Sequence, residues 1–272
     1  MFKKSISKMR HSGFVTRWID YEMRKKIYVI NKYGRPSGFP TIDILELLPD
    51  FKETIVPYSF LDGAASPIDM AILKGLARSI KDCNYLEIGS LRGESLANVA
   101  SVAHKCFSLS LPLEQMEKLG YGNDLIRSHK FYSKNIPNVT HIEHDSQTFA
   151  FSSLETKFDL IFIDGDHYDE CVRRDTINAF QVLRDEDSMI VWHDYSFTPG
   201  QIRWSVLAGI LDGTKESKRN RIFHVSNSQC AIFSNHDYSS LSPIQPEIPN
   251  KCFSVKISLH DGSVSNDRSN QD

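Results

Sequence analysis

Long apolar runs, paired cysteines and an excess of either charge are all scarce in this chain of 272 residues. No apolar run approaches the about 20 residues that cross a bilayer. The N-terminal MFKKSISKMRHSGF has neither the apolar core nor the small-residue cleavage site of a signal peptide. We therefore expect a cytoplasmic protein.

The five cysteines lie far apart and never form a C-x-x-C pair. This spacing suggests neither a disulfide framework nor a zinc site, so we expect buried, reduced thiols.

The formal net charge of −2 and the pI near 6.6 give no bias toward nucleic acid, and none is expected as a partner. The charge is nevertheless uneven, because residues 1–35 hold ten Lys or Arg against only Asp20 and Glu22. Two interpretations stay open for this segment: a solvated helical arm, or weak contact with an anionic membrane surface. A homo-oligomer is also left open.

From residue 66 onward, short β-rich runs alternate with helical periodicity, which is typical of an α/β domain with a largely parallel sheet. After five such strands the alternation stops, and two strands separated by Ser226–Gln229 predict a terminal antiparallel hairpin. The prediction is a Rossmann-like, doubly wound, mostly parallel seven-stranded sheet. Its strands are expected at Asn84–Ile88, Lys105–Leu109, Thr140–Glu143, Phe158–Ile163, Met189–Trp192, Ile222–Val225 and Cys230–Phe233.

These patterns divide the chain into three parts. Residues 1–65 form an N-terminal basic extension and cap, 66–235 form the Rossmann-like domain, and 236–272 form a C-terminal extension with a disordered tail. Ser66 is expected to cap the first helix of the domain, and Pro199–Leu211 is expected to form the helix after the fifth strand.

The strongest local motif is a strand that runs through Glu87 into a glycine turn and then a helix. Gly89 and Gly93 allow backbone conformations and close ligand approach, and the helix N-terminus offers free N–H groups. The spacing is E-x-G-x-x-x-G rather than G-x-G-x-x-G, which disfavours a nicotinamide or flavin cofactor.

Two further motifs should share the same sheet edge. The run FDLIFI is followed by Asp164, Asp166 and His167, and the next strand is followed by His193 and Asp194. Ligands of open α/β sheets bind at the carboxyl ends of the strands, so these groups lie where chemistry is expected.

The segments LEIGSLRGES, FDLIFIDGDHYDECVRRD and MIVWHDY resemble the class I S-adenosylmethionine-dependent methyltransferases, and within them methyltransferase family 24. The sequence is more distantly similar to the metal-dependent macrolide-sugar and catechol O-methyltransferases. The resemblance spans about residues 66–234. It implies S-adenosylmethionine as cofactor, bound by the turn residues Glu87, Gly89, Ser90, Gly93, Glu94 and Ser95 together with Asp164.

Two positions bear on the rest of that cofactor. An acidic residue commonly ends the second strand in the wider class, whereas this chain has Ser110, which can hydrogen-bond a ribose hydroxyl without charge assistance. Asp145 and Ser146 match the position facing the adenine, and a local capping pair is the alternative.

In the metal-dependent relatives, carboxylates after the fourth and fifth strands bind a divalent cation. The matching residues here are Asp164, His193 and Asp194, so an imidazole replaces one carboxylate. Two carboxylates suit Mg²⁺, while an added imidazole favours Mn²⁺, iron or zinc. Without a metal, His193 would be the general base.

The resemblance therefore implies methyl transfer to a hydroxyl of a small molecule or glycan precursor, with Asp166, His167 or His193 taking the proton. Residues 1–65 and 112–137 are expected to build the acceptor side. Two alternatives stay open: a nucleotide- or sugar-binding enzyme on the same scaffold, and a non-catalytic binding protein.

Overall fold

The protein is described here by a computed structural model that covers residues 2–198, 201–239 and 251–259, with side chains from Thr16 onward. Most of the predicted C-terminal tail lies outside the described residues. The core is an eight-stranded sheet in the order β1-β9-β10-β6-β5-β2-β3-β4. The strands are β1 (Thr41–Ile42), β2 (Asn84–Ile88), β3 (Lys105–Ser110), β4 (Val139–Glu143), β5 (Leu160–Ile163), β6 (Met189–Trp192), β9 (Ile222–Val225) and β10 (Ala231–Phe233).

All neighbouring strands are parallel except at β10, which is antiparallel to both β6 and β9. The predicted α/β class, parallel order and terminal hairpin are confirmed. The predicted number of seven is one short, because Thr41 and Ile42 pair with His224 and Val225 as an eighth strand. Two residues have too little periodicity to predict a strand, so only the tertiary pairing reveals β1.

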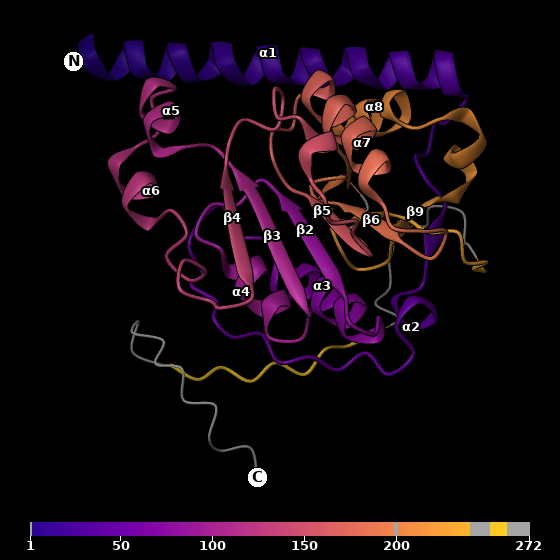
Figure 1. Cartoon of the computed structure of the whole chain (residues 1–272). Coiled ribbons are helices and arrows are strands. Elements are labelled where there is room, and N and C mark those ends of the chain that lie inside the picture. Colours follow the sequence, from indigo (N-terminus) through magenta and orange to yellow (C-terminus); the bar gives the residue numbers. More distant parts are fainter. Residues whose placement is uncertain (1, 199–200, 240–250, 260–272) are drawn as a thin grey trace.

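Helices cover both faces of the sheet (Figure 1). One face packs against α1 (Phe2–Tyr33), α7 (Asp169–Val182) and α8 (Trp204–Gly213), and the other packs against α2 (Ile44–Leu47), α3 (Pro67–Ser79) and α4 (Glu94–Ala100). Strand β5 shows why both faces are apolar, since Ile161 and Ile163 join the first cluster while Leu160 and Phe162 join the second. The short helices α5 (Leu113–Lys118) and α6 (Asn123–Ser128) connect β3 to β4.

Helix α3 begins as predicted, since the Ser66 hydroxyl accepts a hydrogen bond from the Asp69 N–H and Pro67 opens the first turn. The helix predicted at Pro199–Leu211 is different. Pro199 and Gly200 lie outside the described residues. Gln201–Ile202 form β8, which pairs with β7 (Ser196–Thr198), and α8 begins only at Trp204.

Helix α1 is attached to the domain by carboxylates. Glu22 caps α8 from outside that helix, accepting from the N–H groups of Trp204 at 2.6 Å and Ser205 at 3.3 Å. Asp169 accepts from Tyr21 and pairs with Lys25, and Asp212 binds α1 in the same way through Tyr28, Lys32 and Tyr33. The second half of α1 is therefore an integral layer of the fold.

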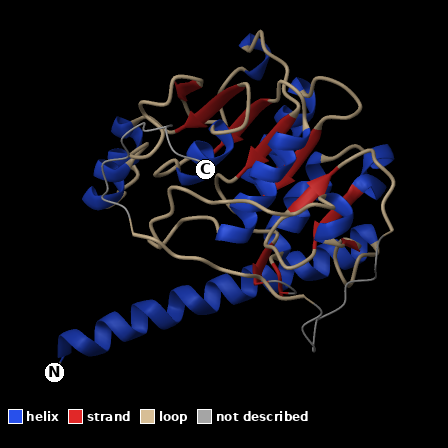
Figure 2. Ribbon diagram, turned by 90° about the horizontal axis from the view of Figure 1, so that it is seen from below, coloured by secondary structure: helices blue, strands red, loops and turns tan. Residues whose placement is uncertain are grey.

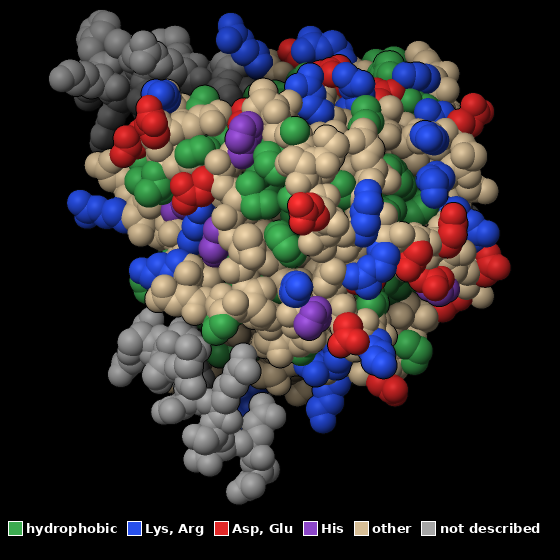
Figure 3. Space-filling view, in the orientation of Figure 1, with side chains coloured by type: hydrophobic (Ala, Val, Ile, Leu, Met, Phe, Trp, Pro, Cys, Tyr) green, Lys and Arg blue, Asp and Glu red, His purple; other side chains and the backbone are tan. Residues whose placement is uncertain are grey.

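The N-terminal end of α1 projects away from the sheet (Figure 2). Lys and Arg side chains gather along the edge of the molecule where the described part of α1 lies (Figure 3). Among the described residues, no helix combines the length and apolarity needed to cross a membrane.

Candidate functional site

The predicted motifs meet at one edge of the sheet, where parallel strands end side by side. The backbone aligns them: Asp164 N–H donates to Ile88 at 2.8 Å and His193 N–H donates to Ile163 at 3.0 Å. The residues that follow β2, β5 and β6 are therefore neighbours, as the sequence predicted.

The two glycines of the turn are required by the packing of the protein itself. Gly89 has φ +89°, and a Cβ there would lie 2.2 Å from the Asp164 carbonyl oxygen. Gly93 has φ +81°, and its Cβ would meet the Ser133 side chain at 2.2 Å. We expected the glycines to let a ligand approach the backbone, but here they let other segments of the chain approach it. This packing gives the turn the shape that would bind a ligand.

Glu87 is buried at the end of β2. Its Oε2 accepts from the Tyr85 hydroxyl at 2.8 Å, while Oε1 and the Ser90 hydroxyl have no hydrogen bond of regular geometry among the described residues. Burial raises the pKa of Glu87 to about 7, although the hydroxyls of Tyr85, Ser90 and Ser95 lower it. Buried polar atoms without a hydrogen bond destabilise the fold unless a ligand or a water molecule forms that bond.

Glu94 is engaged elsewhere. Its carboxylate accepts from the Ser59 N–H at 2.9 Å and from the Ser59 hydroxyl, and it pairs with Arg92 at 3.1 Å. Arg92 in turn donates to the carbonyls of Leu61 and Asp62. Within the turn, Glu94 therefore fastens the preceding loop, and its predicted contact with the cofactor stays a prediction.

Ser110 lies buried at the end of β3, with its hydroxyl 3.5 Å from His129 Nε2. Burial lowers the pKa of His129, so this imidazole is neutral near pH 7. The end of β3 thus offers a neutral hydroxyl and imidazole for hydrogen bonding, where an acidic residue is common in the class.

After β4, Asp145 caps a local turn by accepting from the Gln147 N–H at 2.9 Å and also binds Gln115 at 3.1 Å. The Gln147 side chain donates to Ser146 and to the buried Asp175. Burial raises the pKa of Asp175 to about 7. The capping role considered for Asp145 is present, and contact with an adenine stays a prediction.

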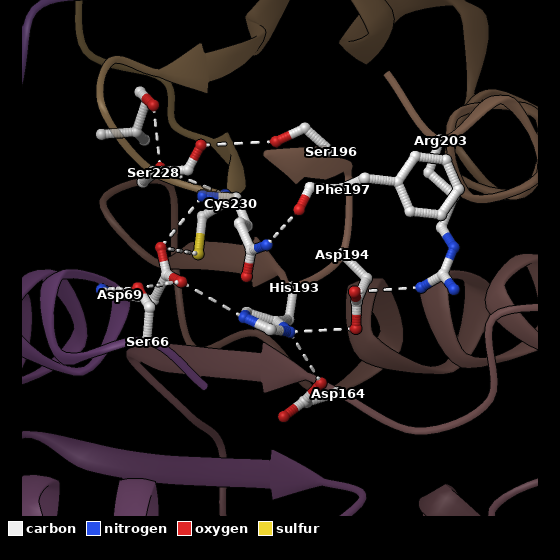
Figure 4. A network of polar contacts seen from close by, with 12 residues as sticks. Ser66, Asp69, Asp164, His193, Asp194, Ser196, Phe197, Arg203, Ser228 and Cys230 are labelled. Carbon is white, nitrogen blue, oxygen red and sulfur yellow. Dashed lines mark hydrogen bonds and ion pairs between the residues drawn. The ribbon is translucent and has the colours of Figure 1, made fainter. Parts of the chain in front are cut away.

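The charged cluster at the ends of β5 and β6 centres on His193 (Figure 4). Its Nδ1 lies 3.1 Å from Asp164 and 3.0 Å from Asp194, and its Nε2 lies 3.3 Å from the fully buried Asp69. Burial alone would lower the pKa of His193, but these carboxylates raise it well above its usual range. Both ring nitrogens face acceptors, so His193 is held as a donor.

Asp194 has three cationic or imidazole neighbours. His167 Nε2 lies 2.8 Å from Asp194 Oδ2, and Arg203 lies 2.9 Å from Oδ1. Burial would raise the pKa of Asp194, but hydrogen bonds from His167 and His193 hold it well below its usual value. Its φ of +54° is uncommon for a non-glycine residue and turns the carboxylate toward the end of β5.

Within the described residues, one set of three side chains could bind a metal ion: Asp164, His167 and Asp194, whose ligand atoms all lie within 4.8 Å of one another. This set contains His167 and not the predicted His193, whose two ring nitrogens face carboxylates; the metal role of His193 stays a prediction. Asp166 lies apart, since it is exposed and its carboxylate accepts from the Tyr168 N–H before α7.

Two residues of the cluster could not be found from the sequence. Asp69 reads as a capping residue in α3, yet it also contacts His193 and accepts from the Gln229 N–H at 3.0 Å. Arg203 falls inside the helix predicted at Pro199–Leu211, and no motif surrounds it. A composition pattern carries no signal for contacts across more than 100 positions.

With this geometry in view, comparison with known proteins gives a family. Residues 86–195 match the family described as a methyltransferase domain. Over these residues the chain is similar to a methyltransferase domain. The matched segment includes the glycine turn and both strand ends of the cluster.

Solved structures resemble the methyltransferase domain at low identity. An O-methyltransferase from Bacillus cereus in complex with SAH is 18% identical, with 63% of this chain and 82% of that chain covered and a TM-score of 0.46. Cofactor-bound Rv0187 from MTB is 19% identical, with coverages of 63% and 81% and a TM-score of 0.46. A Klebsiella pneumoniae protein provisionally assigned as an O-methyltransferase is 17% identical, with coverages of 65% and 84% and a TM-score of 0.47. A search of curated protein sequences finds no significant match.

Proposed function

We propose that this protein transfers a methyl group from S-adenosylmethionine to a hydroxyl oxygen of a small molecule or glycan precursor. The observation that carries the proposal is the buried Glu87 carboxylate beside the Ser90 hydroxyl, at the glycine turn within the matched segment. Glu87 Oε1 and the Ser90 hydroxyl have no hydrogen bond of regular geometry among the described residues. These atoms fit a ligand with hydrogen-bond donors and acceptors, as the amino-acid end of the cofactor has.

The residues after β2, β3 and β4 would hold the cofactor: Glu87, Ser90 and Ser95 in the turn, Ser110 beside His129, and Asp145 with Ser146. When bound, S-adenosylmethionine supplies an activated methyl group on a sulfonium. The protein then has to align the acceptor oxygen and remove its proton.

Asp164, His167 and Asp194 would hold a divalent cation, and two carboxylates with one imidazole favour Mn²⁺ over Mg²⁺. When bound, such a cation lowers the pKa of a coordinated hydroxyl. If no cation binds, His167 is better placed than His193 to accept a proton, because it is partly exposed and oriented by Asp194. Asp166, the other predicted proton acceptor, would have to turn from its exposed position.

Calorimetry on the purified chain tests the cofactor assignment. We expect heat of binding with S-adenosylmethionine and with SAH, and none with a nucleotide sugar such as UDP-glucose. Glu87→Gln should weaken SAH binding about tenfold, or about 1.4 kcal/mol, while the exposed Glu155→Gln should not change it. Binding of UDP-glucose in place of SAH would contradict methyl transfer.

Titration with Mn²⁺ tests the cation site. Asp194→Asn and His167→Ala should each weaken Mn²⁺ binding at least tenfold, whereas Asp124→Asn, on the exposed helix α6, should leave it unchanged. Equal affinities in all three variants would remove the cation from the proposal and leave His167 as the general base.

The cytoplasmic location, the contact of residues 1–35 with anionic membranes and a homo-oligomeric state stay predictions from the sequence. Sedimentation with anionic vesicles before and after removal of residues 2–15 tests the membrane contact without removing the part of α1 that packs on α8.

A further inference from the structure

A cavity of about 760 Å³ lies between α1, the β7–β8 hairpin and the end of β9. We infer that it binds a small molecule with an apolar ring system and an anionic group. This inference rests on the proposed function, in which that molecule is the methyl acceptor.

The cavity occupies the part of the sheet edge that the cofactor motifs leave open. Its walls include Thr41 of β1, His224 of β9 and Tyr195, which directly follows Asp194. In the strand order, β5 and β6 lie between β2 and the pair β9 and β1. The charged cluster is therefore flanked by the glycine turn on one side and the cavity on the other.

The lining is mostly apolar, as in sites for small organic ligands, and the volume falls in the range of about 300–1,000 Å³ typical of such sites. Ile19 and Met23 of α1 are 57% and 52% exposed, although both belong to the cavity wall. Covering them would remove apolar surface from water, which is favourable. The main apolar wall residues are Trp18, Ile19, Met23, Phe39, Ile202 and Trp204.

The charge of the occupant follows from the ionisable side chains in the wall. Glu22 accepts from the N–H groups of Trp204 and Ser205 through Oε2, while its Oε1 is buried and has no hydrogen bond among the described residues. Burial lowers the pKa of His224, which leaves this imidazole neutral. Lys26 lies 5.3 Å from the centre of the Trp204 ring and forms no ion pair with any residue that the structure describes. An ammonium beside an aromatic wall, without a carboxylate partner, favours an anionic ligand.

Arg203 joins the cavity to the cluster. Its guanidinium pairs with Asp194, and it also stacks on two wall residues, lying 4.8 Å from the Phe197 ring centre and 5.4 Å from that of Trp18. Arg203 therefore links Asp194 of the cluster to two residues of the cavity wall, so the cavity adjoins the cluster.

The wall from α1 is already in place, because Glu22, Tyr21 and Lys25 bind it to α7 and α8. A ligand would not have to order this helix, so little of its binding free energy is lost.

Two matched probes test the inference: the anionic dye 1-anilinonaphthalene-8-sulfonate and its neutral analogue N-phenyl-1-naphthylamine. Trp18 and Trp204 line the cavity while Trp192 is fully buried, so tryptophan quenching reports on cavity binding. We expect saturable binding of both probes. Lys26→Met should weaken the sulfonate about tenfold and the neutral probe less than twofold, whereas the exposed Lys52→Met should change neither.

A filling variant checks the location. Ser37→Trp adds a large side chain at an exposed wall position and should abolish binding of both probes, while the exposed Ser152→Trp should not. If Ser37→Trp leaves the affinity of both probes unchanged, or Lys26→Met leaves the affinity of the sulfonate unchanged, the inference is overturned. SAH calorimetry on the same variants should be unchanged. If the unmodified protein does not bind SAH, the proposed function is contradicted, while the result for probe binding in the cavity still stands.

The acceptor role has its own test. Incubation with a small-molecule extract and methyl-labelled S-adenosylmethionine should place label in an anionic, organic-soluble fraction, and Ser37→Trp should prevent this. Label in a neutral or cationic fraction would overturn the assigned class, and absence of label despite SAH binding would overturn the acceptor role.

Discussion

The two halves of the functional edge are built differently. After β2, the motif residues Glu87, Gly89 and Gly93 lie within seven positions, although the two glycines pack against Asp164 and Ser133 from later in the chain. After β5 and β6, the site depends on partners far along the chain: Asp69 reaches His193 across 124 positions, and Tyr21 reaches Asp169 across 148.

The β2 half therefore depends mainly on backbone geometry, and the β5–β6 half depends mainly on the balance of charges. The β2 half tolerates little change in chain shape but contains few charges. The β5–β6 half places three carboxylates around one imidazole, so its stability depends on keeping each charge matched. Four predictions follow this contrast, from the largest expected effect to the smallest.

Gly89→Ala should have the largest effect, destabilising the fold by roughly 4 kcal/mol, because its Cβ would meet the Asp164 carbonyl oxygen at 2.2 Å. Gly120→Ala is the matched control, since Gly120 has φ +79° and nothing within 4 Å of an added Cβ. It should cost about 1–2 kcal/mol from backbone strain alone. Urea unfolding measures both, and equal losses would show that the turn has more room than its geometry indicates.

Asp69→Ala should destabilise by about 3 kcal/mol, because it leaves the buried His193 Nε2 and Gln229 N–H without their acceptor. Ser66→Ala removes the cap of α3 and one hydrogen bond to Asp69 but keeps the Asp69 carboxylate beside His193, and it should cost about 1 kcal/mol. If thermal unfolding shows the same loss for both variants, the network around His193 adds nothing beyond helix capping.

The pH dependence of stability should show the raised pKa of Glu87. Its pKa rises from 4.5 unfolded to about 7 folded, so the folded state binds the extra proton between these values. The burial penalty is absent below about pH 4.5, grows as pH rises and is complete above about pH 7, where it reaches about 3 kcal/mol. Stability relative to Glu87→Gln should therefore fall from pH 5 to pH 8. Parallel urea-unfolding curves for the two proteins across this range would contradict the raised pKa.

Tyr21→Phe should have the smallest effect, about 1 kcal/mol, because it removes one hydrogen bond between α1 and Asp169. The exposed Tyr121→Phe should change stability by less than about 0.5 kcal/mol. A Tyr21 variant as stable as the Tyr121 variant would mean that Lys25 and Glu22 suffice to hold α1 on the domain.

Much of the fold was predictable because its elements carry strong local signals. Strands β2, β6 and β9 have the predicted bounds, and the buried FDLIFI run is β5 at the centre of the sheet. The helix predicted at Pro199–Leu211 was wrong at Gln201 and Ile202, which form β8, because apolar periodicity did not distinguish a short strand from the start of a helix.

By itself, the sequence determined the order of strands and helices, the glycine turn and the meeting of Asp164 with His193 and Asp194, since parallel strands end at one edge. Only the tertiary structure decided that His167 rather than His193 completes the possible metal group, that Asp69 and Arg203 belong to the cluster, and that α1 walls a cavity beside it. The physical reason is that strand and turn preferences act over a few residues, whereas charge pairing and cavity shape depend on which distant side chains pack together.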